Sequence, residues 1–210
     1  MDRAAAPWPV VPQTAGKRCR EEVNALKRQL TGLMTRAVFL DRDGVLIHAK
    51  WRDGAPHPPE TLNDVEVDPD AGLALGQLAR AGYLLILISN QPDVARGKQD
   101  QATVQAINRY LCSRLPIADC FVCYHDDDAA CNCRKPRPGL ILRAAEQYDI
   151  DLGTSFMVGD RWRDVEAGHA AGCLTVWIDH GYQERAPAKL PSATVTTLKH
   201  AVAWILGHQS

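Results

Sequence analysis

The chain has 210 residues, of which 46% are hydrophobic and 23% charged, and its formal net charge at pH 7 is -1. This length and composition are typical of one globular domain with its own core, and the near-zero charge disfavours a protein built to hold nucleic acid. No apolar run approaches the ~20 residues that span a bilayer, and the N-terminus lacks the apolar segment of a secretory signal. We therefore expect a cytoplasmic protein with no nucleic-acid or membrane partner.

The first 35 residues are predicted to be an extension, followed by a domain at residues 36–208. Residues 1–18 are rich in Ala and Pro and have no period, which is typical of a loose segment. Apolar residues recur at helical spacing over residues 20–33, so this stretch predicts a helix that either packs on the domain or forms a dimer contact. We expect a monomer or a weak homodimer. Met34, just before the first strand, is an alternative start of the chain.

Short apolar strands alternate with helical stretches through the rest of the chain. Continuous apolar strands in such an alternation predict a parallel sheet with helices on both faces, a three-layer, Rossmann-like α/β fold. Strands are expected at residues 37–40, 83–88, 121–122, 155–158 and 174–178, and helices at residues 70–81, 101–115, 138–148, 164–171 and 197–206.

Polar motifs follow three of these strands at the edge of the sheet where ligands bind in open α/β folds. They are Asp41-x-Asp43, Ser89-Asn90-Gln91 and Gly159-Asp160, and Lys135 precedes a further helix. Taken singly, the aspartates are better explained as a solvated turn and a helix N-cap. Their joint occurrence at strand ends favours a shared site.

Each of these residue types suits a step of phosphoryl transfer. A carboxylate such as Asp41 can attack phosphorus and form an aspartyl-phosphate, while Asp43 protonates the leaving oxygen and then activates water. Asp41 and Asp160 would repel a phosphate, so a magnesium ion with oxygen ligands is expected between them. Ser89 offers donors to the phosphoryl oxygens, and Lys135 offers positive charge to the transition state.

The four motifs together resemble those of the haloacid dehalogenase superfamily of phosphatases. The resemblance runs from about Val38 to Asp179. It implies that Asp41 is the nucleophile and that Asp43 is the general acid/base, with its backbone carbonyl bound to magnesium. It also implies that Asp160 completes the magnesium site and that Asp164 supports this site without binding the metal directly. The matching segments are Phe39-Leu40-Asp41-Arg42-Asp43-Gly44-Val45, Ser89-Asn90-Gln91, Cys133-Arg134-Lys135-Pro136 and Val158-Gly159-Asp160-x-x-x-Asp164.

Four of the seven cysteines fall between residues 120 and 133, which favours a metal site over a disulfide framework. Cys123-x-His125 and Cys131-x-Cys133 supply three thiols and one imidazole, a tetrahedral set for structural zinc. If residues 121–125 are extended, Cys120 points away from this set. Two alternatives remain: Cys120 in place of His125, or free thiols. Zinc in the loop at residues 123–133 would fix Arg134 and Lys135 over the site.

The zinc loop resembles that of two phosphatase families, which act on D-glycero-D-manno-heptose 1,7-bisphosphate and on histidinol phosphate. The gaps after Asp43 and Ser89 have no room for a large cap domain, so selectivity should rest on loops. Arg96 and Arg134 are the main candidates for a second phosphate, which favours the heptose enzymes and a role in lipopolysaccharide or glycan synthesis. The short loop between His125 and Cys131 is more similar to the histidinol-phosphate enzymes.

The expected substrate is therefore a small phosphorylated sugar, with histidinol phosphate as the alternative. The acidic run at residues 126–128 could attract a cationic substrate, although such a run is most often a solvated loop tip. A nucleic-acid 3′-phosphatase would require a basic, aromatic groove. An inactive zinc-stabilised binding module should have lost one of the catalytic residues, and none is missing.

Overall fold

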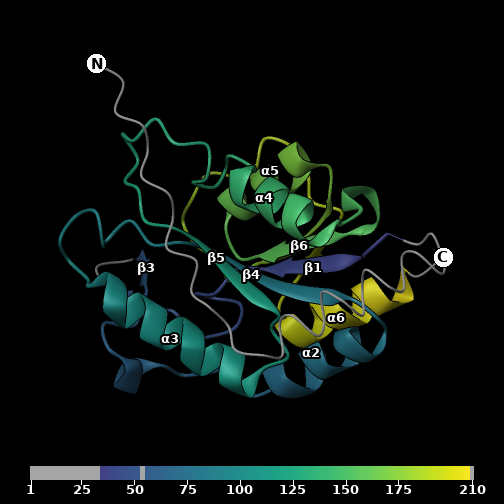
Figure 1. The fold of residues 1–210 in the computed structure, drawn as a ribbon, viewed down its shortest axis with the longest axis horizontal. Helices are drawn as coiled ribbons and strands as arrows, with labels where there is room; N and C mark the ends of the chain where they lie inside the picture. The colour runs from purple at the N-terminus through teal and green to yellow at the C-terminus, as the bar shows by residue number, and fades with distance from the viewer. Residues whose placement is uncertain (1–33, 53–54, 209–210) are drawn as a thin grey trace. The chain divides into compact units, whose positions relative to one another are not determined.

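The computed structural model describes residues 34–52 and 55–208, and the helix predicted at residues 20–33 lies outside them. Six strands form one parallel sheet in the order β5-β4-β1-β6-β7-β8 (Figure 1). The strands are β1 (Ala37–Leu40), β4 (Leu84–Asn90), β5 (Asp119–Cys123), β6 (Phe156–Gly159), β7 (Leu174–Ile178) and β8 (Ala193–Val195). The predicted parallel α/β sheet is confirmed.

Helices cover both faces of the sheet, as expected. One face carries α2 (Ala71–Arg80), α3 (Gln101–Arg114) and α6 (Leu198–Gly207), and the other carries α4 (Gly139–Tyr148) and α5 (Trp162–Ala171) (Figure 1). Across residues 34–52 and 55–208, no helix combines the length and the apolar character that crossing a bilayer requires.

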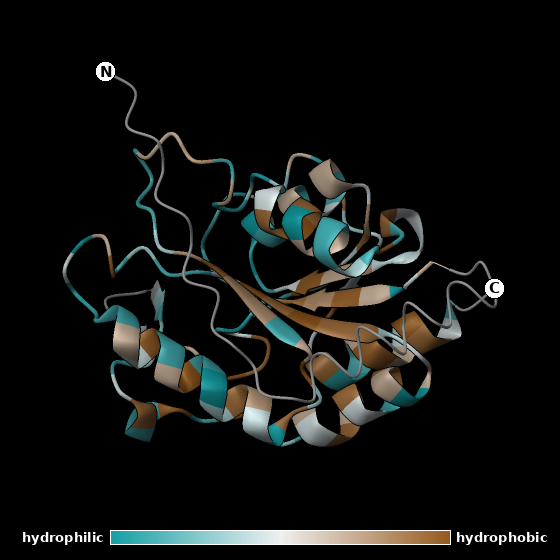
Figure 2. Cartoon of the chain, in the orientation of Figure 1, coloured by the Kyte–Doolittle hydropathy of each residue, from teal (hydrophilic) through white to brown (hydrophobic). Residues whose placement is uncertain are grey.

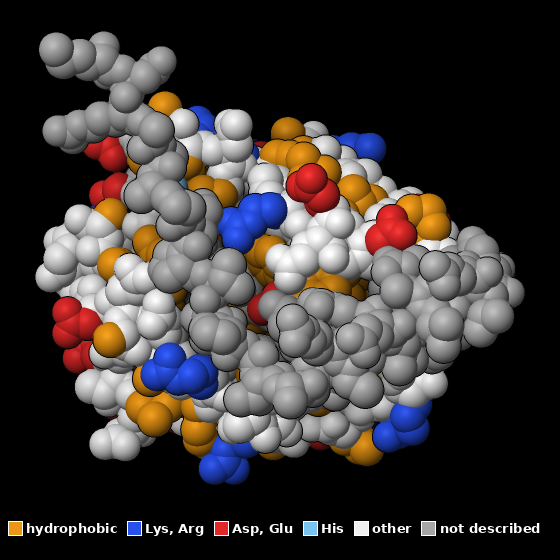
Figure 3. All heavy atoms as spheres, in the orientation of Figure 1, with side chains coloured by type: hydrophobic (Ala, Val, Ile, Leu, Met, Phe, Trp, Pro, Cys, Tyr) orange, Lys and Arg blue, Asp and Glu red, His pale blue; other side chains and the backbone are white. Residues whose placement is uncertain are grey.

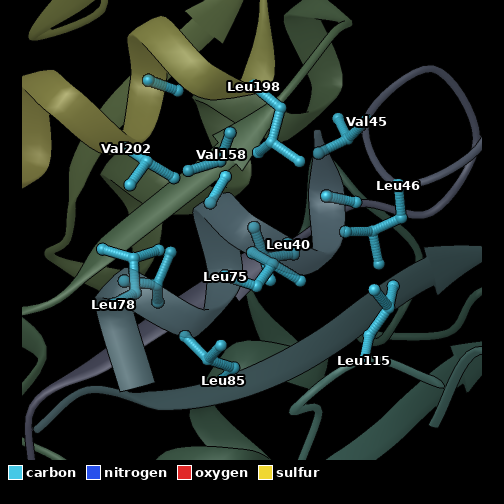
Figure 4. Packing of buried hydrophobic residues seen from close by; sticks show 14 of the residues in the cluster. Leu40, Val45, Leu46, Leu75, Leu78, Leu85, Leu115, Val158, Leu198 and Val202 are labelled. Carbon is cyan, nitrogen blue, oxygen red and sulfur yellow. The ribbon is translucent and has the colours of Figure 1, made fainter. Parts of the chain in front are cut away.

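The central strands are apolar on both sides because each side faces a helical layer. In β1, Val38 and Leu40 pack toward α2 and α6, while Ala37 and Phe39 pack toward α4 and α5. The sheet is accordingly hydrophobic along its whole middle, whereas the helices alternate hydrophobic and polar residues (Figure 2). Figure 4 shows Leu40 surrounded by leucines and valines on the face of the sheet that α2 and α6 cover. This packing fixes the position of the residue that follows β1.

The boundaries of some elements differ from those expected. β4 continues through Ser89 and Asn90, so these residues belong to the strand. α5 begins two residues before the expected start, with Arg161 at its N-cap, because Asp164 accepts the Arg161 N–H across the first turn. Asp160 is therefore not the helix cap.

Several short elements carry no clear periodicity and were not predicted. A hairpin of β2 (Lys50–Arg52) and β3 (Ala55–His57) follows β1, and two 3-10 turns occupy η1 (Leu62–Asp64) and η2 (Leu152–Thr154). β8 pairs at the sheet edge with only three residues. Within the described residues this hairpin is the small insertion between β1 and α2, and no cap domain is present.

Charges of both signs are dispersed over the described part of the face shown in Figure 3, with hydrophobic side chains between them. This distribution agrees with the near-zero net charge.

Candidate active site

The candidate active site is a cavity of about 340 Å³ at the carboxyl ends of the central strands β1, β4 and β6. This edge is where parallel sheets bind ligands. Ser89 is buried and does not line the cavity. The other predicted catalytic and phosphate-binding residues line the cavity: Asp41, Asp43, Asn90, Gln91, Arg96, Arg134, Lys135 and Asp160. The fold thus brings together side chains that lie far apart in the sequence.

Lys135 forms ion pairs with two carboxylates at the base of the cavity. Its Nζ lies 2.8 Å from Asp41 Oδ1 and 2.6 Å from Asp164 Oδ1, and donates to the Ile88 carbonyl at 2.9 Å. Burial alone would lower the pKa of Lys135, but the two carboxylates outweigh burial and raise that pKa. Lys135 therefore holds a fixed positive charge beside Asp41, at a point where growing negative charge would be stabilised.

Asp160 presents a buried oxygen, Oδ1, with no hydrogen-bond partner among the described residues. Asp41, Asp160 and Asp164 can each offer an oxygen within 4.8 Å of the others. Burial and then the negative charges of Asp41 and Asp164 raise the pKa of Asp160 well above its usual range. A hard divalent cation with oxygen ligands would offset both effects. The residues present therefore fit magnesium.

Two glycines allow the acidic groups to approach so closely. Gly44 has a φ of +84°, and a Cβ there would lie 2.0 Å from Asp160 Oδ2. A Cβ on Gly159 would lie 2.1 Å from Asp164 Cβ. Any other residue would displace one of these carboxylates, because contacts this short do not occur.

Asp164 lies beneath Asp41 and Asp160, at the start of α5. Besides Lys135, it accepts the backbone N–H of Arg161 at 3.0 Å. Burial raises the pKa of Asp164 to about 6, and the charge of Lys135 only partly offsets this. Asp164 also lines the cavity, so it lies beside Asp41 and Asp160 and holds Lys135 in place.

Asp43 is held by a residue whose contribution was not predicted from sequence, Arg42. The Arg42 side chain is completely buried, and its Nε and Nη2 donate to Asp43 at 3.1–3.2 Å. Its Nη1 donates to Asn108 of α3 at 3.2 Å. Gln91 Nε2 donates to Asp43 Oδ2 at 2.7 Å from the other side. The Asp43 carboxylate is therefore held from two directions. The sequence signal that could have identified Arg42 is its position between two aspartates.

Asn90 connects the second motif to the lysine loop. Its Nδ2 donates to the Lys135 carbonyl at 3.0 Å, and its Oδ1 accepts the Lys135 N–H at 3.1 Å. Ser89 Oγ accepts from Gln91 Nε2 at 2.9 Å. Two hydrogen bonds to one backbone unit orient Lys135 toward Asp41, so Asn90 positions the lysine loop.

The predicted zinc ligands Cys123, His125, Cys131 and Cys133 form one cluster, with their ligand atoms within 4.8 Å of one another. Cys123 Sγ lies 3.3 Å from Cys133 Sγ, 3.9 Å from Cys131 Sγ and 3.6 Å from His125 Nδ1. Ligands of tetrahedral zinc are roughly 3.5–3.8 Å apart, given bonds of ~2.0–2.3 Å. Cys120 lies outside the cluster and contacts Cys112, as its opposite orientation predicted. The donor set fits zinc.

The loop that carries these ligands is also tied to α4. Gly139 donates its N–H to the Asn132 carbonyl at 3.0 Å, and a Cβ on Gly139 would lie 2.2 Å from that oxygen. Arg137 Nη1 donates to the Ala129 carbonyl at 3.3 Å and also to the Cys131 carbonyl. Arg137 thus supports the loop from within.

The cavity rim contains arginines paired with the acidic run at residues 126–128. Arg96 donates through Nε to both oxygens of Asp126 at 2.9 Å, and these hydrogen bonds lower the pKa of Asp126 to about 2. Arg134 donates to Asp127 Oδ1 at 2.7 and 2.9 Å. The acidic run is therefore not a simple solvated loop tip, because two of its carboxylates neutralise rim arginines.

Three further segments lie at the cavity or contact residues that line or border it. The hairpin lines the cavity through Pro56 and His57, and Arg163 lines it from the first turn of α5. After β7, His180 Nε2 lies 2.8 Å from the Gly44 carbonyl oxygen, and Tyr182 hydrogen-bonds with Asp160. Short polar segments without periodicity gave no signal for Arg163, His180 or Tyr182, except that Arg163 lies one position before Asp164.

Comparison with known proteins agrees with this geometry. Residues 132–201 match a family model described as HAD-hydrolase-like. A D-glycero-beta-D-manno-heptose-1,7-bisphosphate 7-phosphatase of Rhodopseudomonas palustris is 37% identical over 65% of this chain and 79% of its own. A D-glycero-alpha-D-manno-heptose-1,7-bisphosphate 7-phosphatase of Photorhabdus laumondii is 30% identical over 80% of this chain and 96% of its own.

A solved structure is similar over the same region. The D,D-heptose 1,7-bisphosphate phosphatase of B. bronchiseptica, complexed with magnesium and phosphate, superposes with a TM-score of 0.69 at 29% identity. The alignment covers 82% of this chain and 99% of that structure.

Proposed function

Because this chain belongs to the haloacid dehalogenase superfamily and is a homologue of the heptose-1,7-bisphosphate 7-phosphatases, we propose that it is a magnesium-dependent phosphatase of a small sugar phosphate. The proposed reaction converts D-glycero-D-manno-heptose 1,7-bisphosphate to heptose 1-phosphate. The observation that carries the chemistry is Asp41, next to Lys135 and to the unpartnered buried oxygen of Asp160.

In the proposed mechanism Asp41 attacks phosphorus and forms an aspartyl-phosphate. Asp43, held by Arg42 and Gln91, protonates the leaving sugar oxygen. Asp43 then takes a proton from the water that hydrolyses the intermediate. Lys135 stabilises negative charge on the transferring group. Ser89, Asn90 and Gln91 form the phosphate-binding segment, in which Asn90 also orients the lysine.

The proposed magnesium ligands are the side chains of Asp41 and Asp160 and the backbone carbonyl of Asp43. The support is the set of convergent carboxylates and the raised pKa of Asp160. Magnesium would neutralise charge between the carboxylates and the phosphate. Asp164 keeps Lys135 in place beneath the site.

Zinc is proposed as a structural ion bound by Cys123, His125, Cys131 and Cys133. All four positions are taken by protein ligands, so no open position remains for substrate. Only one residue separates Cys133 from Lys135. A fixed loop would therefore hold Arg134 and Lys135 at the cavity.

A second phosphate on the substrate is proposed to bind at the rim, with Arg134 as the main contact and Arg96 beside it. Both line the cavity, and a guanidinium binds phosphate through two parallel hydrogen bonds. The pairing of Asp126 and Asp127 with these arginines leaves little uncompensated negative charge for a cationic substrate such as histidinol phosphate.

The test is a panel of substrates assayed with magnesium. It contains both anomers of heptose 1,7-bisphosphate, heptose 7-phosphate, other sugar phosphates and histidinol phosphate. We expect one heptose bisphosphate to have the highest kcat/KM. A preference for histidinol phosphate of about tenfold or more, which is ~1.4 kcal/mol in the transition state, would contradict the proposal.

A further inference from the structure

One carboxylate at the tip of the zinc loop contacts three cavity-lining arginines. Asp127 Oδ1 accepts from Arg134 Nε and Nη2 at 2.9 and 2.7 Å, and Oδ2 lies 3.0 Å from Arg96 Nη2. Arg163 Nη2 lies 4.0 Å from Oδ1. All three arginines line the cavity, whereas Asp127 stands outside its lining. Three guanidinium groups converging on one anion are the usual arrangement of a phosphate site.

Each arginine has another contact that remains when Asp127 is left out of account. Arg134 Nη1 donates to the His125 carbonyl at 3.3 Å. Arg96 donates hydrogen bonds to both oxygens of Asp126 and also forms an ion pair with Asp93 at 3.4 Å. Arg163 stacks on Trp162, with its guanidinium carbon 4.5 Å from the ring centre. Asp127 is thus not required to hold these side chains in position.

Asp127 is free to leave, because 57% of its side chain is exposed while that of Arg134 is only 11% exposed. We propose that Asp127 is a specificity-determining residue that competes with the second phosphate of a substrate for Arg134 and Arg163. A phosphate with more charge and more acceptor oxygens replaces the carboxylate, which turns toward solvent. A substrate with one phosphate leaves this contact in place. The inference rests on the proposed function, since it concerns the rim of that same site.

The test compares Asp127→Asn, Asp127→Ser and Asp128→Asn with the unaltered enzyme. Asp128 is an exposed acid in the same loop, so its variant makes the same charge change one residue away. The substrates are heptose 1,7-bisphosphate and p-nitrophenyl phosphate, which carries one phosphate. We expect both Asp127 variants to lower KM for the bisphosphate about two- to fivefold, the range for an exposed charged pair. The ratio of kcat/KM for the bisphosphate to kcat/KM for p-nitrophenyl phosphate should rise by the same factor.

Asp128→Asn should retain the ratio of the unaltered enzyme. An unchanged or higher KM for the bisphosphate in both Asp127 variants would overturn the inference, and a higher KM would identify Asp127 as a support for the arginines. Bound zinc and the unfolding temperature, measured on each variant, verify that the loop is intact.

Failure of the proposed function gives a different pattern. If the unaltered enzyme does not prefer heptose bisphosphate, the same variants are tested by inhibition of p-nitrophenyl phosphate hydrolysis. Fructose 1,6-bisphosphate and fructose 6-phosphate are then the competing probes. A lower inhibition constant for the bisphosphate alone supports the role of Asp127, and equal constants across the variants overturn it.

Discussion

Both the base of the cavity and its rim pair basic side chains with aspartates, but the pairs at the base are buried and those at the rim are exposed. At the base, Lys135 is 3% exposed and pairs with two buried carboxylates. At the rim, Arg96 is 33% exposed and pairs with Asp126, which is 32% exposed. Water and salt screen the rim pairs, so each contributes little to stability, whereas breaking a buried pair leaves an uncompensated charge.

The difference separates the chemistry from the selection of substrate. The base is fixed by the ends of packed strands, by close glycines and by hydrogen bonds such as that from Arg42 to Asp43. The rim is built mostly from loops, and its ion pairs are exposed. Substitutions at the base should therefore affect kcat most, and substitutions at the rim should affect KM.

The largest expected effect is that of Asp41→Asn. The amide cannot attack phosphorus, so kcat should fall by at least about a thousandfold with every substrate. The measurement is phosphate release with magnesium at saturating substrate. Asp70→Asn, at the exposed start of α2, is the matched control and should retain activity. Substantial activity in Asp41→Asn would rule out Asp41 as the nucleophile.

Lys135→Met should lower kcat about a hundredfold or more, because the positive charge beside Asp41 is lost. It should also destabilise the fold by about 3–5 kcal/mol, since Asp41 and Asp164 then lose their buried partner. Denaturant unfolding measures the second effect. Lys98→Met, also at the cavity, is the control and should change neither quantity much. Equal stability of the two variants would contradict the account of the base.

Cys131→Ser should release zinc and lower the unfolding temperature by several degrees, as expected for a loss of ~1–2 kcal/mol in a chain of this size. We expect kcat to fall about tenfold, because the loop that carries Lys135 loosens. Metal analysis on the purified variant measures the zinc content, and calorimetry measures the unfolding temperature. Cys112→Ser, outside the cluster, should keep its zinc. Full zinc content in Cys131→Ser would contradict the ligand assignment.

The smallest effect belongs to the rim. Arg96→Lys should raise KM for heptose bisphosphate by less than about fivefold and leave kcat unchanged, since exposed pairs contribute at most ~1 kcal/mol. Steady-state kinetics at two salt concentrations measure this change, and the difference in KM between the variant and the unaltered enzyme should be larger at low salt. A large loss of kcat in this variant would place Arg96 in the chemical step and erase the distinction between base and rim.

The sequence predicted the parallel sheet and the base of the cavity well, because both depend on strong local signals. Apolar strands such as residues 37–40 are readable without knowledge of their neighbours, and parallel strands end at one edge. The clustering of Cys123, His125, Cys131 and Cys133 was predictable because their spacing and residue types are typical of a zinc site.

Side-chain direction was not predictable from sequence. Arg42 and Arg163 were missed as parts of the site, because a charge next to an aspartate usually faces water. The pairing of Asp127 with rim arginines joins residues separated by up to 36 positions, and no short-range pattern records it. The hairpin β2–β3 has three-residue strands that pair with each other, too short for a clear period.

In the proposed mechanism Asp41 becomes phosphorylated during each turnover. With p-nitrophenyl phosphate, whose leaving group needs no proton, Asp43→Asn should slow hydrolysis of the intermediate more than its formation, so that enzyme quenched in acid during turnover carries one phosphoryl group. Peptide mapping by mass spectrometry is expected to locate that group on Asp41. A phosphoryl group on another residue, or none during confirmed turnover, would contradict the account.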